Sequence, residues 1–271
     1  MQRALLALAP RLLVVLLLPA IAPLTGCASL NQAVSNFNTF SVEEDVQLGR
    51  AAYQETLGES RVLTTGPGAQ QVQRVTARLV EAALVDAPAF AQDFPWEARL
   101  IDAPEQVNAF CLPGGKMAVY TGILPVAQSD AGLAVVMGHE IAHATLRHGT
   151  KAVSRQQILV GGVAAIDLVL RGSDRDPEYA TAAALLATSL IGLKYGRSAE
   201  LEADRVGLIT MARAGYDPRE AVAFWQRMAA QGGQQGPEWL STHPSHGNRI
   251  AQIEGLLPEA VAIYEAVTAG P

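Results

Sequence analysis

The chain has 271 residues, of which 49% are hydrophobic and 17% are charged, and its formal net charge at pH 7 is −6. This length and apolar content suffice for one substantial hydrophobic core and do not fit a disordered chain, so one globular domain is expected. The acidic balance argues against nucleic acid as a partner, because phosphate binding calls for a basic face.

Residues 1–26 have the layout of a secretory signal peptide, with Arg3 and Arg11 ahead of an aliphatic run that ends in small residues. Its last residues and Cys27 read "LTGC", which resembles the bacterial lipobox, where the cysteine is lipidated and becomes the first mature residue. The alternative of an uncleaved membrane anchor is disfavoured, because three prolines interrupt the run and a spanning helix needs ~20 apolar residues. We therefore predict membrane attachment through lipid on Cys27.

The predicted lipidation sets the expected location. Ala28 follows the cysteine, where the resembled lipoproteins that stay at the inner membrane carry aspartate, so we expect the periplasmic face of the outer membrane of a bacterial envelope. Residues 28–40 are polar, uncharged and aperiodic, which predicts a tether over 27–40 between the lipid and the domain. Cys111 is the one other cysteine and is expected to be a small buried hydrophobe.

The domain is expected to span 41–265, starting with a helix over 41–58. Ser41 and Glu44 at its start form the pattern of a capping box. A second amphipathic helix is predicted over 69–84, and strands are predicted over 96–103 and 115–124.

From Ala131 onward the pattern is almost wholly helical, so the expected fold class is mainly α with a small β-sheet (α+β). Two apolar helices over 156–172 and 181–196 form a hairpin around a charged linker. Both are short for a bilayer span, which favours core or lid helices, with a membrane-facing hairpin as the alternative.

The stretch "HEIAH" carries two histidines four residues apart, His139 and His143. A helix turns about 100° per residue, so both imidazoles lie on one face, one turn apart, where they can share a metal ion. Glu140 lies beside them, and zinc lowers the pKa of a bound water to about 7, so this carboxylate can take the proton. The alternative, two solvated histidines, is weakened by the apolar residues around them, because unpaired polar groups are costly to bury.

A third ligand is expected from the stretch "ELEAD". Glu200 and Asp204 share a helix face, so Glu200 can complete a His₂Glu site while Asp204 orients a ligand imidazole. An exposed acidic face is the alternative. Glu202 is expected to be solvated or bonded to a helix terminus, and His148, nearly opposite His139 on an ideal helix, is expected to be exposed or to cap a helix.

Four motifs in one order carry a family resemblance: "NAFCLPGG" at 108–115, "HEIAH" at 139–143, "ELEAD" at 200–204 and "HPSHGNRI" at 243–250. With them the chain resembles the zinc metallopeptidases that include HtpX and the CaaX prenyl proteases, and its layout is most similar to the periplasmic lipoprotein proteases LoiP and BepA. The resemblance implies a zincin-type metallopeptidase domain with one Zn²⁺ per chain.

Carried over by position, the resemblance makes His139, His143 and Glu200 the zinc ligands and Glu140 the general base. The segment 108–115 and the strand after it would form an edge that binds an extended peptide through its main chain. The substrate-binding residues implied there are Asn108, Ala109, Phe110, Gly114 and Gly115.

His243 and Arg249 match the family's late motif, which implies that they stabilise the oxyanion of the tetrahedral intermediate. A second implied role is autoinhibition, with His243 in the open zinc position. An interhelical polar contact is the structural alternative for both residues.

The expected function is therefore that of a lipid-anchored zinc metalloendopeptidase that degrades misfolded or unassembled envelope proteins. The rival hypothesis is a chaperone or assembly scaffold of the envelope with a latent or structural zinc site. Specific substrates and the oligomeric state stay open at this stage.

Overall fold

The structure is a computed structural model, and it describes residues 37–155, 160–172, 177–231, 238–243 and 249–270. The predicted signal peptide, Cys27 and the tether up to residue 36 lie outside the described residues. The fold below is that of the unit formed by residues 37–271.

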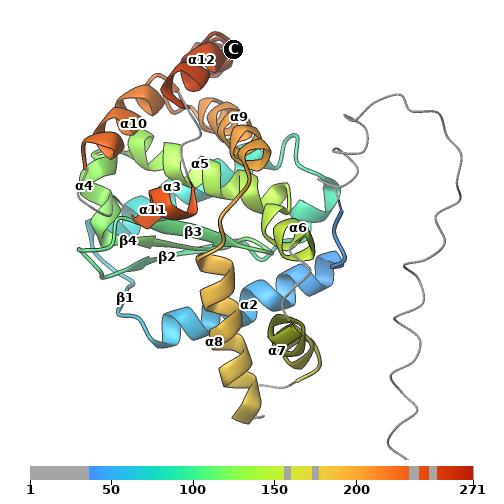
Figure 1. Cartoon of the computed structure of the whole chain (residues 1–271). Coiled ribbons are helices and arrows are strands. Elements are labelled where there is room, and N and C mark those ends of the chain that lie inside the picture. The colour runs from blue at the N-terminus through green and yellow to red at the C-terminus, as the bar shows by residue number, and fades with distance from the viewer. Residues whose placement is uncertain (1–36, 156–159, 173–176, 232–237, 244–248, 271) are drawn as a thin grey trace, which may run out of the picture. The chain divides into compact units, whose positions relative to one another are not determined.

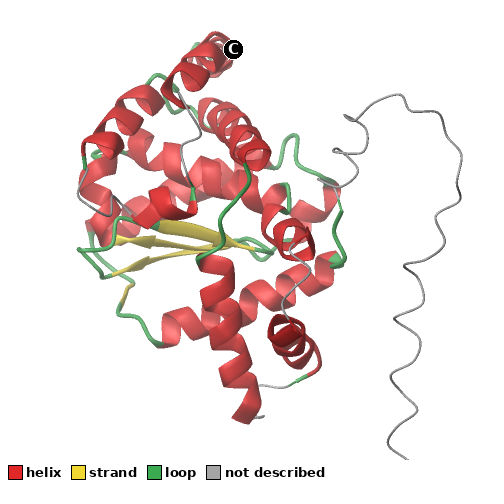
Figure 2. Cartoon of the chain, viewed as in Figure 1, coloured by secondary structure: helices red, strands yellow, loops and turns green. Residues whose placement is uncertain are grey.

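A mixed four-stranded sheet lies between layers of helices (Figures 1 and 2). Its strands are β1 (Val62–Leu63), β2 (Glu97–Ile101), β3 (Ala109–Leu112) and β4 (Lys116–Tyr120). They follow the order β1-β2-β4-β3, with β2 parallel to β4 and the outer strands antiparallel to their neighbours. The predicted strands correspond to β2 and β4, whereas β1 and the edge strand β3 are too short to show a clear alternation.

Among the described residues, helices account for the rest of the regular structure, apart from two short 3₁₀ segments, η1 (Ala89–Asp93) and η2 (Thr121–Ile123). The helices are α2 (Val42–Gly58), α3 (Pro67–Ala83), α4 (Leu124–Ala127), α5 (Asp130–Thr145), α6 (His148–Arg155), α7 (Val160–Arg171), α8 (Pro177–Ile191), α9 (Arg197–Arg213), α10 (Glu220–Ala230), α11 (Glu238–Thr242) and α12 (Arg249–Thr268). The predicted α+β class, mainly helical with a small sheet, is confirmed.

The two faces of the sheet bury different helices because side chains alternate along a strand. Cys111 and Met117 belong to a core cluster shared with α3, α5, α9 and α10. Phe110 and Ala118 point the other way, into a cluster with α2, α7 and α8. Figure 1 shows α5 above the sheet and α2 and α8 below it.

The start of α2 follows the predicted capping box. Ser41 Oγ accepts a hydrogen bond from the backbone N–H of Glu44, and Glu44 Oε2 accepts one from the backbone N–H of Ser41. Just before the cap, Asn38 Nδ2 donates to Thr150 Oγ1 of α6, and the N–H of Thr39 donates to Ser154 Oγ. The chain is thus attached to α6 before α2 begins.

The described parts of the apolar hairpin form core helices, as the favoured reading predicted. Ile166 and Val169 of α7 and Leu186 and Leu190 of α8 are buried in the cluster under the sheet. Among the described helices, none has the length and hydropathy that a bilayer span needs.

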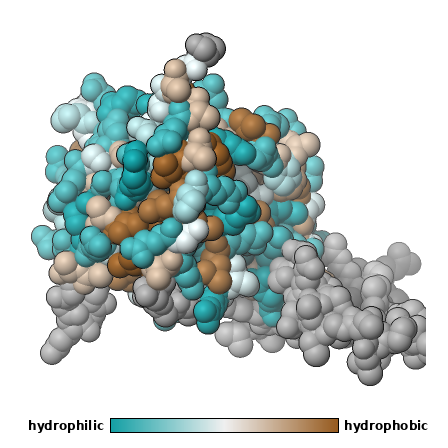
Figure 3. Space-filling view, turned by 90° about the horizontal axis from the view of Figure 1, so that it is seen from above, coloured by the Kyte–Doolittle hydropathy of each residue, from teal (hydrophilic) through white to brown (hydrophobic). Residues whose placement is uncertain are grey.

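The face on the other side of the sheet from α8 is seen from above in Figure 3. Hydrophobic surface gathers in the middle of this face, with hydrophilic residues around it.

Helices α5 and α9 cross at a glycine pair. A Cβ atom added to Gly207 would lie 2.7 Å from the backbone nitrogen of His139, and one added to Gly138 would lie 2.9 Å from the carbonyl oxygen of Gly207. Both distances are shorter than real Cβ contacts, so only glycine permits this approach. The close crossing is what places the acidic residues of α9 beside the histidines of α5.

Candidate metal centre

Helix α5 carries the first three residues of the site. His139, Glu140 and His143 are all buried, with no more than 3% of each residue exposed. The one-turn spacing holds as predicted, and His139 Nε2 lies 3.0 Å from His143 Nε2. Ser129 caps the start of α5 by accepting a hydrogen bond from the backbone N–H of Gly132.

Two further side chains reach these rings from other elements. Glu200, in the first turn of α9, places Oε1 3.5 Å from His143 Nε2. His243, directly after α11, places Nδ1 3.1 Å from His139 Nε2 and 3.1 Å from Glu200 Oε1. One ligand atom from each of the four residues lies within 4.8 Å of the other three.

The spacing of these atoms fits a tetrahedral zinc site. Zinc bonds of about 2.0–2.1 Å to nitrogen and oxygen place the ligand atoms of a tetrahedron about 3.3 Å apart. Four of the six separations among these atoms are 3.0 to 3.5 Å and lie on both sides of that value, and the other two are within 4.8 Å. The donor set of three imidazoles and one carboxylate is also one that zinc prefers, whereas Mg²⁺ and Ca²⁺ take oxygen ligands.

The charge state of the site also fits a cation. Burial lowers the pKa of His143 well below its usual value, so this ring is neutral, as a ligand must be. Burial alone would raise the pKa of Glu200, but hydrogen bonds to His143 and His243 outweigh it and lower that pKa. Burial likewise opposes the ionised form of His243, yet the carboxylates of Glu140 and Glu200 raise its pKa. The pocket thus attracts positive charge.

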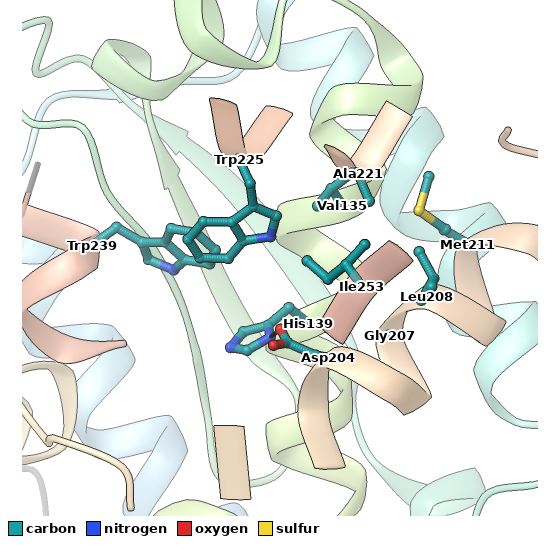
Figure 4. Close-up of a pocket in the computed structure, with 10 residues that line it drawn as sticks. All are labelled: Val135, His139, Asp204, Gly207, Leu208, Met211, Ala221, Trp225, Trp239 and Ile253. Carbon is teal, nitrogen blue, oxygen red and sulfur yellow. Dashed lines mark hydrogen bonds and ion pairs between the residues drawn. The ribbon is translucent and has the colours of Figure 1, made fainter. Parts of the chain in front are cut away.

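Asp204 lies beside the first histidine, where the sequence predicts it, and its role in orienting that ring stays a prediction. Its Oδ1 lies 3.0 Å from His139 Nδ1, so the ring proton sits on Nδ1 and Nε2 turns a lone pair toward the other ligands. Burial alone would raise the pKa of Asp204, but His139 and Arg249 lower this pKa by more. The net pKa lies below its usual value, so the carboxyl group is ionised. Figure 4 shows His139 and Asp204 together at one end of a pocket lined by apolar residues.

Arg249 is buried and joins α12 to α9. Its Nε donates to Asp204 Oδ2 at 2.8 Å, its Nη1 lies 3.2 Å from Glu200 Oε2, and its guanidinium stacks 3.9 Å from the ring centre of Trp225. These are the interhelical polar contacts considered as the structural alternative, while an oxyanion role for Arg249 stays a prediction.

Glu140 is held by groups that the sequence did not single out. The indole Nε1–H of Trp239 donates to Oε1 at 2.8 Å, and the backbone N–H of Cys111 donates to Oε2 at 3.2 Å. His243 Nε2 lies 3.2 Å from the same Oε1. Trp239 stacks on Trp225, as Figure 4 shows, which fixes the indole against the site. No motif spacing marks Trp239, because its role depends on how α11 packs.

The predicted substrate edge lies beside the site through one residue of β3, Cys111, whose thiol has its pKa raised by burial and by Glu140. Asn108 is buried and its Oδ1 accepts a hydrogen bond from the N–H of Ala109, next to the start of the strand. Phe110 points to the opposite face of the sheet. Substrate contacts of Asn108, Ala109 and Phe110 stay a prediction.

Gly114 and Gly115 form the turn between β3 and β4, and the structure shows a conformational reason for both. Their φ angles are +77° and +83°, in the region that favours glycine. A Cβ atom would lie 2.7 Å from Val46 at Gly114 and 2.6 Å from the Trp96 ring at Gly115. Peptide binding by the two glycines stays a prediction.

The expectation for His148 is wrong on exposure. The residue is only 3% exposed, and its Nδ1 lies 3.0 Å from His143 Nδ1. The expectation assumed one continuous helix, but α5 ends at Thr145 and Arg147 has a φ of +57°. Glu202 is exposed as expected, and its Oε2 lies 3.3 Å from His148 Nε2.

Tyr195 is a further residue that the sequence did not single out. It lies between α8 and α9, and its ring stacks on His143 with a centroid distance of 4.0 Å. Burial raises its pKa, so the hydroxyl stays protonated. Its ring also stacks on that of His243, with a centroid distance of 5.4 Å.

A helix with HExxH, an acidic ligand from a second helix and a small sheet beside the site define the zinc metallopeptidase class. Residues 68–257 match the family model of peptidase family M48. This chain belongs to that family.

Several curated relatives are similar over most of the chain. Identity is 37% to the mitochondrial metalloendopeptidase OMA1 of Schizosaccharomyces pombe, over 83% of this chain and 64% of that protein. It is 35% to human OMA1, over 74% of this chain and 39% of the relative. Identity is 28% to the beta-barrel assembly-enhancing protease of Escherichia coli, over 79% of this chain and 44% of that protein. The chain thus spans less than two thirds of the length of these relatives.

Proposed function

We propose that the protein is a zinc-dependent metalloendopeptidase that degrades misfolded or unassembled envelope proteins. The observation that carries the proposal is the buried set of ligand atoms from His139, His143 and Glu200, with the Glu140 carboxylate on the same helix. A structural zinc site has no need of an adjacent base, whereas hydrolysis does.

Each residue has a distinct part in the proposed hydrolysis. Zinc bound at this site supplies Lewis-acid polarisation of the peptide carbonyl and makes water more acidic. Glu140 takes the proton of the attacking water and then donates it to the leaving amine. Trp239 and the N–H of Cys111 hold its carboxylate in place from two sides. Asp204 keeps His139 in the tautomer that a ligand requires.

The relatives support protein substrates, since their names describe an endopeptidase and a protease. A strand edge with free main-chain groups binds peptides largely regardless of sequence. We expect broad specificity from the segment 108–115 once it is uncovered, since its residues are buried in this structure. This suits substrates that are recognised because they are unfolded.

Metal removal tests the proposed function. Prolonged dialysis against a chelator is expected to reduce cleavage of casein to background, and one equivalent of Zn²⁺ is expected to restore it. Mg²⁺ should not restore it, because it prefers oxygen ligands. Full activity in a preparation shown by elemental analysis to lack zinc would refute the proposal.

We further propose that the protein is held at the periplasmic face of a bacterial outer membrane by lipid on Cys27, on the strength of the lipobox-like "LTGC". Cells fed a labelled fatty acid are expected to label the wild-type chain and not Cys27→Ser. Equal labelling of the two proteins, or none in either, would contradict the lipid anchor without touching the peptidase proposal.

A further inference from the structure

The outer nitrogen of the second ligand ring faces another histidine. His143 Nε2 points at the ligand group, 3.0 Å from His139 Nε2. Its Nδ1 lies on the other side of the ring, 3.0 Å from His148 Nδ1. A metal-binding Nε2 carries no proton, so the proton of a neutral His143 sits on Nδ1. His143 therefore donates this hydrogen bond and His148 accepts it.

The proton of His148 must then lie on its other nitrogen. A neutral imidazole has one donor and one acceptor, and Nδ1 is the acceptor here. His148 Nε2 lies 3.3 Å from Glu202 Oε2, and a carboxylate only accepts. The two hydrogen bonds therefore run in one direction: His143 donates to His148, and His148 donates to Glu202.

A break in the chain brings His148 to this place. On an uninterrupted helix its side chain would project about 140° away from that of His143. Arg147 adopts the left-handed φ of +57°, and α6 starts anew at His148. A left-handed conformation is unfavourable for a residue other than glycine, and it persists only where surrounding contacts hold it. Arg147 is held through its side chain, with Nε 2.5 Å from the buried Asp45 and Nη2 2.6 Å from the carbonyl oxygen of Phe40.

The first ligand ring has a matching outer partner. His139 Nδ1 reaches Asp204 directly, whereas His143 reaches a carboxylate through His148. Both carboxylates come from α9, which also supplies Glu200. Outer hydrogen bonds of this kind set the tautomer and the ring plane of metal-binding histidines.

We propose that His148 and Glu202 are positioning residues that hold His143 in its zinc-binding tautomer and orientation. The inference rests on the zinc site of the proposed function and concerns metal affinity and geometry, which are measurable without any substrate.

The test compares zinc dissociation constants, measured by competition with a chromophoric chelator, and the visible spectra of Co²⁺-loaded proteins. His148→Leu removes the acceptor and is expected to weaken zinc binding by about 10- to 100-fold and to change the Co²⁺ bands. His148→Asn places an amide oxygen near the position of Nδ1, so it is expected to recover most of the affinity and the wild-type bands.

Glu202→Ala gives a second arm, because the exposed Glu202 side chain can be removed with little risk to folding. A smaller loss of zinc affinity than in His148→Leu is expected. No loss is expected in Glu259→Ala, which removes an exposed carboxylate of α12 that pairs with Arg205 of α9. Thermal unfolding of the metal-free proteins checks that each variant is folded.

Two results would overturn the inference. One is wild-type zinc affinity in both folded His148→Leu and Glu202→Ala. The other is a His148→Asn protein as weak as His148→Leu, which would reduce His148 to a packing residue. Either result leaves the zinc site itself intact, whereas failure of the wild-type protein to bind zinc would refute the proposed function.

Discussion

Glu140→Gln is expected to abolish cleavage of casein while one zinc ion per chain remains bound. Glutamine has nearly the shape of glutamate and keeps an oxygen that can accept from Trp239 or from the N–H of Cys111, so the surrounding packing should survive. It cannot take a proton from water, and loss of general-base catalysis typically costs about 10²- to 10⁴-fold in rate. The measurements are the initial cleavage rate and the zinc content of the same preparation.

The matched control is Glu254→Gln on α12, an exposed glutamate that should cleave at the wild-type rate. Wild-type activity in Glu140→Gln would show that Glu140 is not the general base. A protein that never cuts its clients, and that prevents their aggregation equally well with and without Glu140, would favour the assembly scaffold.

His243→Ala is expected to raise the initial rate on a short unstructured peptide by at least about tenfold, the gain if the open form is a minor state of up to about 10%. In the structure Nδ1 of this histidine lies among the ligand atoms, and Nε2 lies 3.2 Å from Glu140 Oε1. We therefore propose that the ring takes the position that a substrate needs and also engages the base. Removing it leaves three protein ligands, enough for a catalytic zinc.

The sign of this effect separates the two roles implied for His243. An oxyanion-stabilising histidine would instead make the variant about 10²-fold slower. Thr242→Ala, in the preceding residue, serves as control for loosening of α11 and should leave the rate near that of the wild type. A slower His243→Ala protein with full zinc content would contradict autoinhibition.

Local sequence patterns predicted those parts of the molecule that depend on neighbours along the chain. The capping box at Ser41 needs contacts only within the first turn of α2. The spacing of His139 and His143 likewise depends on one helix alone. The strand β4 was predicted next to a glycine turn, although its residues 117–120 are all buried rather than alternately buried.

The remaining parts depend on how distant elements pack, which one sequence does not display. The approach of α9 to α5 requires Gly138 and Gly207 to face each other, and neither glycine is marked by its neighbours. Trp239 reaches Glu140 across a separation of 99 residues. His148 was misplaced because the helical period was extended past Arg147, whose left-handed conformation depends on a contact with α2.

The pattern "ELEAD" contains both residues whose positions the sequence predicts and one residue whose partner it does not predict. Glu200 and Asp204 lie beside the histidines as the spacing predicts. Glu202 points to the other side of His143, where its partner is visible only in the folded chain. In the proposal above, these three carboxylates all serve the same metal: one as ligand and two through the outer nitrogens of the histidines.

X-ray absorption at the zinc edge of the purified protein tests the central claim most directly. We predict one zinc ion per chain with only nitrogen and oxygen neighbours at about 2.0–2.1 Å, including the outer-shell scattering of imidazole rings. The buried thiol of Cys111, whose pKa is raised, should not contribute. A sulfur neighbour at about 2.3 Å, or no stoichiometric zinc, would contradict the site built from His139, His143 and Glu200.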